Sequence, residues 1–255
     1  MVRALHAFWA ALKDVFEEFV FMALCNIIWA LMSLPLLILT YIFFITPTIN
    51  IIVPLLTFLL AVLPMAPATG ALFHVAQRTA DGRVSKMGDF FAGMREHAVA
   101  SWRIMGIWMF GVMIGFVNLY FYNELTGLVG AVVLGLWFYL LVVWLSLLIY
   151  AFPLLLLQTT PSLRLLARNA FLMTLGRPVF TTTTLVLMIV ILIASILMPF
   201  FLLLITGALL AQWSTRATLA LIEIERQRRA AQAEADTTNA LPNEEKGRRG
   251  QVRPK

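Results

Sequence analysis

Long, almost uncharged apolar runs alternate along the chain with short charged segments. A hydrophobic helix needs about 20 residues to cross the hydrocarbon core of a bilayer. Residues 179–211 carry no charge and would be about 50 Å long as one helix, so we expect a turn near Pro199. The pattern predicts an all-α integral membrane protein, a six-helix transmembrane bundle. The predicted spans cover residues 20–44, 51–77, 102–122, 127–157, 179–198 and 200–221.

Three further segments carry apolar residues on one helical face only. Residues 1–19 place Leu5 and Trp9 at helical spacing away from the charged positions, and residues 87–94 and 161–175 follow the same pattern. Such segments lie in the plane of the membrane surface, so we expect short amphipathic interfacial helices.

The chain therefore divides into three parts. Residues 1–19 form an amphipathic interfacial helix, and residues 20–222 form the six-span transmembrane domain. Residues 223–255 form a basic cytoplasmic tail, in which charged residues, glutamine, asparagine and proline predominate. This composition buries too little apolar surface to fold alone, so we expect the tail to be largely disordered.

Composition and charge support the same class. The chain is 61% hydrophobic and 13% charged, whereas a soluble domain carries roughly 25% charged residues. With the N-terminus placed inside, all 19 lysine and arginine residues fall on the cytoplasmic side, and Glu124 is the only charge in the predicted outer loops. We therefore expect both termini in the cytoplasm. Because topology explains the net charge of +6, we expect no nucleic-acid partner.

The stretch from Pro64 to His74 organises the second span. Pro64 and Pro67 cannot both lie inside an undistorted helix, because each lacks an N–H and its ring clashes with the preceding turn. The small residues that follow, Gly70 among them, let another helix come close. We therefore expect a kinked or broken span whose small residues pack against the first span, and we expect any cavity in the bundle to open beside Thr69.

Polar side chains inside the spans are few. Asn26 lies three positions before Trp29, so the two share one helical face. An amide without a partner is costly in lipid, and we therefore expect Asn26 to hydrogen-bond to another helix. A ligand contact is the alternative. No charged residue lies at mid-membrane depth, which argues against transport by a carboxylate relay.

Groups that could support catalysis or bind a cofactor are scarce. Cys25 is the single cysteine, so no intramolecular disulfide and no thiolate metal cluster is available. The sequence contains no glycine-rich phosphate loop and no Gly-x-Ser-x-Gly or His-Glu-x-x-His motif. His74 is expected to be alone, because His6 and His97 fall on separate predicted surface helices, and a metal site needs three or four ligands. We expect no enzyme activity and no catalytic, cofactor-binding or metal site.

Small residues one turn apart recur in three spans. The pairs are Gly111 and Gly115, Ala131 and Gly135, and Gly207 and Ala211. Such spacing lets two helices approach closely. The sequence leaves two interpretations open, packing inside the monomer and the seam of a homo-oligomer.

Several short motifs follow one another in an order that can be compared with known families. They are Asn26-x-x-Trp29, the run from Pro67 to Phe73, Gly82 followed by Phe90-Phe91, Tyr150-x-Phe152-Pro153, and Asn169-Ala170 ahead of Arg177-Pro178. Over about residues 10–225 this order resembles the YesL-like family of bacterial membrane proteins, a domain of unknown function. The chain departs from the family pattern by an additional apolar stretch near residues 38–59.

The resemblance implies a location and a role but no catalytic residues. The location is the bacterial cytoplasmic (inner) membrane. Members of the family are often suspected of assisting carbohydrate uptake, so the leading hypothesis is a non-enzymatic accessory or component of solute transport beside importer permease subunits. One alternative is a structural or regulatory scaffold that binds a cytosolic protein or anionic lipid, and another is a small stand-alone transporter or channel.

The residues that we single out as a candidate structural or functional motif come from the spans and from one predicted surface helix. They are Asn26, Trp29, Pro64, Pro67, Thr69, Gly70, His74 and Asn169.

Overall fold

The computed structural model describes residues 2–125, 127–158 and 162–240, with side chains described for 3–125, 127–158 and 162–236. The chain separates into two compact units, Met1–Thr218 and Leu219–Lys255. The described residues are helical and contain no strand. The helices are α1 (Val2–Glu17), α2 (Phe19–Ile45), α3 (Ile52–Leu60), α4 (Val62–Ala80), α5 (Met87–Glu96), α6 (Ala98–Tyr122), α7 (Gly127–Leu157), α8 (Leu163–Gly176), α9 (Pro178–Leu197), α10 (Pro199–Phe201), the π-helix η1 (Leu202–Thr206) and α11 (Gly207–Ala240).

Within the described residues, six helices are long and apolar enough to cross a membrane, so the predicted all-α six-helix class is confirmed. They cover Phe19–Ile45, Ile52–Ala80, Ala98–Tyr122, Gly127–Leu157, Pro178–Leu197 and Pro199–Asp236. Most ends lie within a few residues of the predicted ones. The third span begins earlier than expected, at Ala98, because α6 starts directly after His97, the residue that ends α5.

The second span is broken one turn before its prolines. The interruption falls at Ala61, which separates α3 from α4. Pro64 then lies in the first turn of α4, where a backbone N–H would have no partner within the helix. Pro67 lies inside α4 and leaves the Leu63 carbonyl without its usual donor. Trp102 Nε1, on α6, donates to this Leu63 oxygen at 2.9 Å.

A proline in the fourth span is accommodated in the same way. Pro153 lies inside α7 and removes the N–H that would bond to the Ile149 carbonyl. The hydroxyl of Ser214, on α11, donates to that Ile149 oxygen. Both proline sites therefore connect two helices, because a neighbouring side chain replaces the missing backbone donor.

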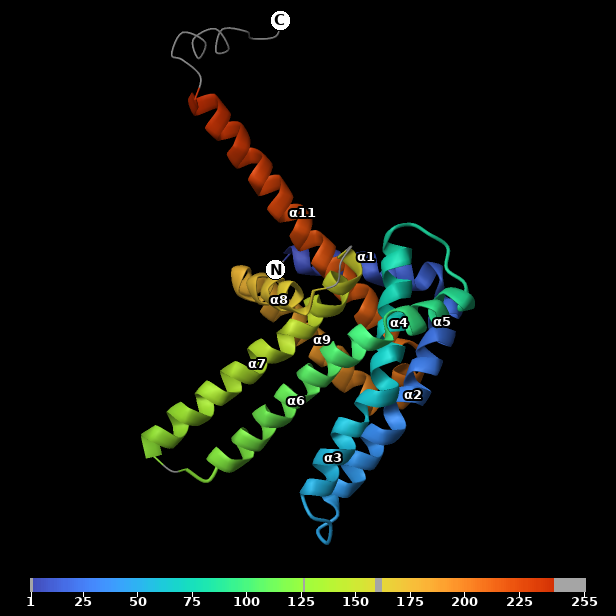
Figure 1. Ribbon diagram of the computed structural model, residues 1–255, viewed down its shortest axis with the longest axis vertical. Helices are drawn as coiled ribbons and strands as arrows, with labels where there is room; N and C mark the ends of the chain where they lie inside the picture. The colour runs from blue at the N-terminus through green and yellow to red at the C-terminus, as the bar shows by residue number, and fades with distance from the viewer. Residues whose placement is uncertain (1, 126, 159–161, 241–255) are drawn as a thin grey trace, which may run out of the picture. The chain divides into compact units, whose positions relative to one another are not determined.

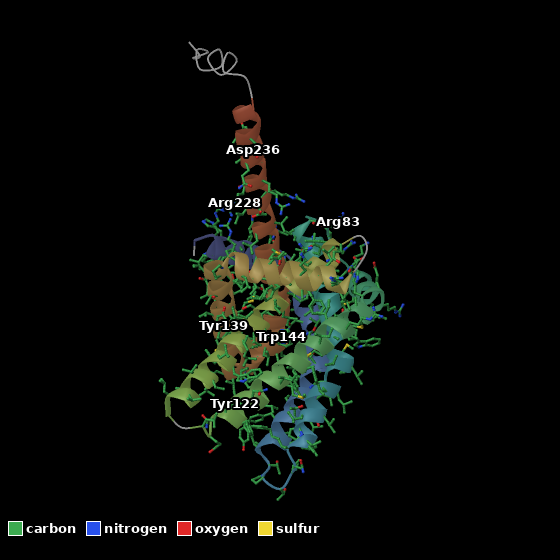
Figure 2. The ribbon with its side chains drawn as sticks, turned by 60° about the vertical axis from the view of Figure 1, so that its left-hand side comes forward. Arg83, Tyr122, Tyr139, Trp144, Arg228 and Asp236 are labelled. Carbon is green, nitrogen blue, oxygen red and sulfur yellow. The ribbon has the colours of Figure 1, made fainter. Side chains whose placement is uncertain are left out.

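The three short helices α1, α5 and α8 lie at the end of the first unit opposite the α2–α3 and α6–α7 turns (Figure 1). Side-chain nitrogen atoms gather near Arg83 at this end, whereas the side chains around Tyr122 and Tyr139 are almost entirely carbon (Figure 2). The bounds of the predicted surface helices agree with α1 and α5 to within a few residues. The predicted start of α8 at Pro161 lies outside the described residues, and the described helix begins at Leu163 after the N-cap Ser162.

The first part of the C-terminal tail is helical. α11 continues through Ala240 and therefore includes residues 223–240. Alanine, glutamate, glutamine and arginine all have high helix propensity, and the side chains of Glu225 and Arg229 pair at 3.4 Å one turn apart. Residues 241–255, the rest of the predicted tail, lie outside the described residues.

Candidate functional site

Asn26 uses its whole amide group to hold the sixth span. Its Nδ2 donates to the carbonyl oxygens of Leu202 at 3.0 Å and Leu203 at 2.7 Å, and its Oδ1 accepts from the backbone N–H of Ala208 at 2.9 Å. Leu202 and Leu203 belong to η1, where the π-helical turn disrupts the usual α-helical bonding. The predicted interhelical hydrogen bond of Asn26 is therefore present, and the amide is fully engaged with protein atoms.

Trp29 connects α2 to the second span. Its Nε1 donates to Thr69 Oγ1 on α4 at 3.0 Å. The ring also lies against Gly207, because a Cβ atom at Gly207 would lie only 2.7 Å from Trp29 Cε3 and 2.9 Å from Asn26 Oδ1. We call Asn26, Trp29, Thr69 and Gly207, together with η1, the three-span junction. It joins α2, α4 and the start of α11.

Gly70 brings α4 against the start of α6. A Cβ atom at Gly70 would lie 2.2 Å from Ser101 Oγ and 3.7 Å from His97 Cβ. Gly70 therefore allows the close helix approach that was predicted, but its partner is α6 and not the first span as expected. Two more of the motif residues also lie apart from the three-span junction. Pro64 is in the first turn of α4, and Asn169 is half-buried on α8.

The expectation that His74 stands alone is wrong. His74 Nδ1 lies 3.1 Å from His97 Nε2, and Glu96 adds a carboxylate oxygen, so that the three ligand atoms lie within 4.8 Å of one another. The approach depends on Gly93, where a Cβ atom would lie 2.6 Å from His74 Cβ. His97 follows Gly93 by one helical turn and therefore lies over the same imidazole.

The electrostatics at this cluster favour an uncharged imidazole. Partial burial lowers the pKa of His97 below its ordinary value, and the neighbouring Glu96 carboxylate opposes that shift. Arg78 lies one turn beyond His74 on α4, but its guanidinium pairs with Asp89 at 3.4 Å. A neutral imidazole offers the lone pair that a metal ion needs. His74, Glu96 and His97 are thus the described residues that could hold a metal.

Reasoning from the sequence also missed that Asp14 is buried. We expected this residue on the outward, polar face of the first helix, but it lies against α11. Arg216 donates to both of its oxygens, at 2.6 and 2.8 Å, and Gln212 Nε2 donates at 2.6 Å. Among the described side chains, Asp14 is the only charged one that is buried. The short spacing of small residues Ala4, Ala7 and Ala11 on the same face was the signal that this face packs against protein.

Two tryptophans join α6 to α7 reciprocally. Trp108 Nε1 donates to the Trp144 carbonyl at 3.2 Å, and Trp144 Nε1 donates to the Trp108 carbonyl at 2.9 Å. The Trp144 ring fits because Gly111 has no side chain, since a Cβ atom there would lie 2.2 Å from the ring. Gly115 similarly meets Leu141. The Gly111–Gly115 pair therefore packs inside the monomer, which is one of the two interpretations left open.

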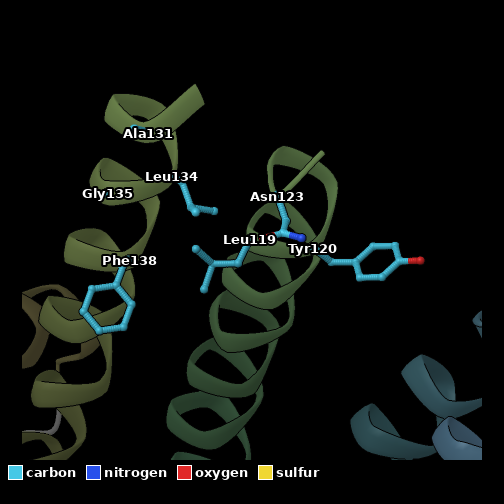
Figure 3. A pocket seen from close by; sticks show the side chains of 7 residues that line it. All are labelled: Leu119, Tyr120, Asn123, Ala131, Leu134, Gly135 and Phe138. Carbon is cyan, nitrogen blue, oxygen red and sulfur yellow. The ribbon is translucent and has the colours of Figure 1, made fainter. Parts of the chain in front are cut away.

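A groove of about 560 Å³ lies between α6 and α7 near the turn that joins them (Figure 3). Leu119, Leu134 and Phe138 line it with apolar side chains, and Asn123 contributes an amide. No atom lies within 4 Å of the position where a Cβ of Gly135 would be, so this side of α7 is open. Such walls suit a lipid acyl chain better than a sugar, whose hydroxyl groups need hydrogen-bonding partners.

Comparison with known proteins finds no family model, no curated protein and no solved structure that matches this chain. The resemblance to the YesL-like family therefore remains an expectation drawn from the order of the motifs. The structure shows a bundle whose described part has six helices long and apolar enough to span a membrane, a three-span junction that contains three of the predicted motif residues, and a histidine–glutamate cluster at the α4–α5–α6 contact.

Proposed function

We propose that this chain is a non-enzymatic membrane protein that works beside a solute importer and does not itself form the passage for the solute. The observation that carries the proposal is the three-span junction, in which Asn26 and Trp29 direct their polar atoms at other helices. A carrier uses polar groups of broken helices at mid-membrane depth to bind its solute. Here α4 of the broken second span and the π-helix η1 both bond to side chains of α2.

The membership that we propose in the YesL-like family supplies the substrate class, which is carbohydrate, and the bacterial cytoplasmic membrane as the location. The charge distribution supports cytoplasmic N- and C-termini. On this proposal the surface that meets importer permease subunits is α8. Its exposed face carries Leu165, Phe171 and Leu172 together with Arg164 and Arg168, while Leu166 and Ala170 are buried on the opposite face.

A second candidate function is a scaffold that binds a cytosolic protein or anionic lipid. The observation that favours it is the mixture of arginine and apolar side chains on the exposed face of α8, which suits the headgroup region of a membrane. A stand-alone transporter or channel is the third and weakest candidate, because the polar side chains of the three-span junction are bonded to other helices.

The test is capture from native membranes in a mild detergent, followed by quantitative mass spectrometry. The baits are the unaltered chain, Leu172→Asp on α8, and Val84→Asp as the matched control on the exposed linker before α5. We expect importer permease subunits to be enriched with the unaltered bait and with Val84→Asp, and to be lost with Leu172→Asp. Repeated capture without any permease subunit contradicts the proposal.

A further inference from the structure

The His74–Glu96–His97 cluster is assembled by helix packing rather than by chance contact of surface side chains. Gly70 and His74 lie one turn apart on α4, and both face the α5–α6 junction. Gly93 provides the space for His74, and His97 follows it by one turn, with its backbone N–H donating to the Gly93 carbonyl at 3.0 Å. His97 in turn begins α6, because its carbonyl accepts from Ser101 N–H at 2.8 Å.

The spacing of the two imidazoles matches that of two ligands on one metal ion. Nitrogens that each lie about 2.0–2.1 Å from a Zn²⁺ ion are about 3.3 Å apart in tetrahedral coordination. His74 Nδ1 and His97 Nε2 are 3.1 Å apart. A Glu96 carboxylate oxygen and one ring nitrogen of each histidine lie within 4.8 Å of one another, and the exposed Glu96 side chain can rotate toward the imidazoles.

We propose that His74, Glu96 and His97 form a binding site for one divalent transition-metal ion, with Zn²⁺ as the preferred occupant. Two imidazoles and one carboxylate suit zinc, whereas Mg²⁺ and Ca²⁺ prefer sites made of oxygen ligands. Three protein ligands leave a coordination position open for water or for a group from a partner. The ion connects α4 to the α5–α6 junction and fixes the orientation of both.

The alternative arrangement is a hydrogen bond between the two imidazoles, in which one ring nitrogen donates to the other. In the metal site neither of these nitrogens carries a proton, so the two arrangements respond differently to added metal. The proposal does not depend on the proposed transport role, because it rests on the three side chains alone.

The experiment is a zinc titration of the full-length chain in detergent, purified with an affinity tag that contains no histidine and washed with chelator. Binding is measured by competition with a chromophoric zinc chelator, with Mg²⁺ as the negative control. We expect one Zn²⁺ per chain, at least tenfold weaker binding in His97→Gln, and weaker binding in Glu96→Gln. His6→Gln is the matched control, because His6 is the remaining histidine of the chain and lies on α1.

Equal zinc binding by His97→Gln and His6→Gln overturns the proposal, as does the absence of zinc binding by the unaltered chain at tens of micromolar. A second measurement needs no variant and so does not depend on variant folding. Co²⁺ added to the unaltered chain is expected to give the visible absorption bands of a Co²⁺ ion that nitrogen and oxygen ligands coordinate in a site of low symmetry. A Co²⁺ spectrum identical to that in buffer overturns the proposal as well.

Discussion

Asn26 shows how a single amide can hold a membrane helix that departs from α-helical geometry. Its two donors bond to the carbonyls of Leu202 and Leu203, and its acceptor takes the Ala208 N–H. In a bilayer these backbone groups have no water to bond with, so an interhelical partner takes its place. The sequence predicted that Asn26 would hydrogen-bond to another helix. It did not predict the partner, because no sequence signal marked the π-helix.

We expect Asn26→Ala to lower the free energy of unfolding by about 2 kcal/mol, since three interhelical bonds are lost at about 0.6 kcal/mol or somewhat more each. The matched control is Asn118→Ala. Its amide bonds only to the Ile114 carbonyl one turn earlier in the same helix, at 2.8 Å. Steric trapping in bilayers measures the free energy of unfolding of both variants. Equal effects of the two substitutions contradict the structural role of Asn26.

Gly207 tests the packing of the same junction. A methyl group at this position would overlap Trp29, so we expect Gly207→Ala to destabilise the protein by about 1–3 kcal/mol. Gly135→Ala introduces the same methyl group on a helix where nothing lies within 4 Å, and we expect it to be neutral or slightly stabilising. Thermal unfolding in detergent measures the stability of the two variants. A neutral Gly207→Ala contradicts the close contact.

At the scale of elements, α1 is attached to the bundle by charge as well as by packing. Asp14 is held by Arg216 and Gln212, while the pair formed by Lys13 and Glu17 at 3.6 Å is exposed. Removing one member of a buried pair leaves the other charge without a partner, which costs more than the pair itself contributes.

We therefore expect Asp14→Ala to destabilise the protein by about 2–3 kcal/mol, somewhat less than for a fully buried pair because the Arg216 side chain is 29% exposed. Glu17→Ala, on the same helix, removes only an exposed pair and is expected to cost less than about 0.5 kcal/mol. Denaturant titrations compare the two. If both variants unfold at the same denaturant concentration, the Asp14 contact does not hold α1.

The elements themselves were largely predictable, because each span is a long apolar run that only a membrane helix satisfies. The contacts between elements were less predictable from the sequence. Pro64 and Pro67 predicted a break in the second span, but not that it would fall at Ala61 or that Trp102 would replace the missing donor. These outcomes depend on which helices become neighbours.

The histidine cluster was missed for a related reason. His74 and His97 are 23 positions apart and lie on different helices, so no local pattern connects them. What brings them together is Gly93, which removes the side chain that would otherwise separate α5 from α4. Glycine inside a short amphipathic helix was the available signal, and it acquires meaning only once the facing residue is known.

At the scale of the whole molecule, the charge distribution predicts the orientation of the spans in the membrane. In a Cys25→Ala background, we expect Asn123→Cys, in the exposed turn after α6, to react with an impermeant thiol reagent added to intact cells. Gln232→Cys, on the exposed part of α11, is expected to react only after permeabilisation. Comparable labelling of both cysteines in intact cells contradicts the six-span orientation.

We propose that the polar residues inside the bundle hold the helices together and do not form a path for solute. Liposome swelling with sugars of increasing size tests this most directly, using the purified chain reconstituted without a partner. We expect swelling rates equal to those of protein-free liposomes, for the unaltered chain and for Thr69→Val alike. Swelling several-fold faster than in protein-free liposomes, and reduced by Thr69→Val, would contradict it.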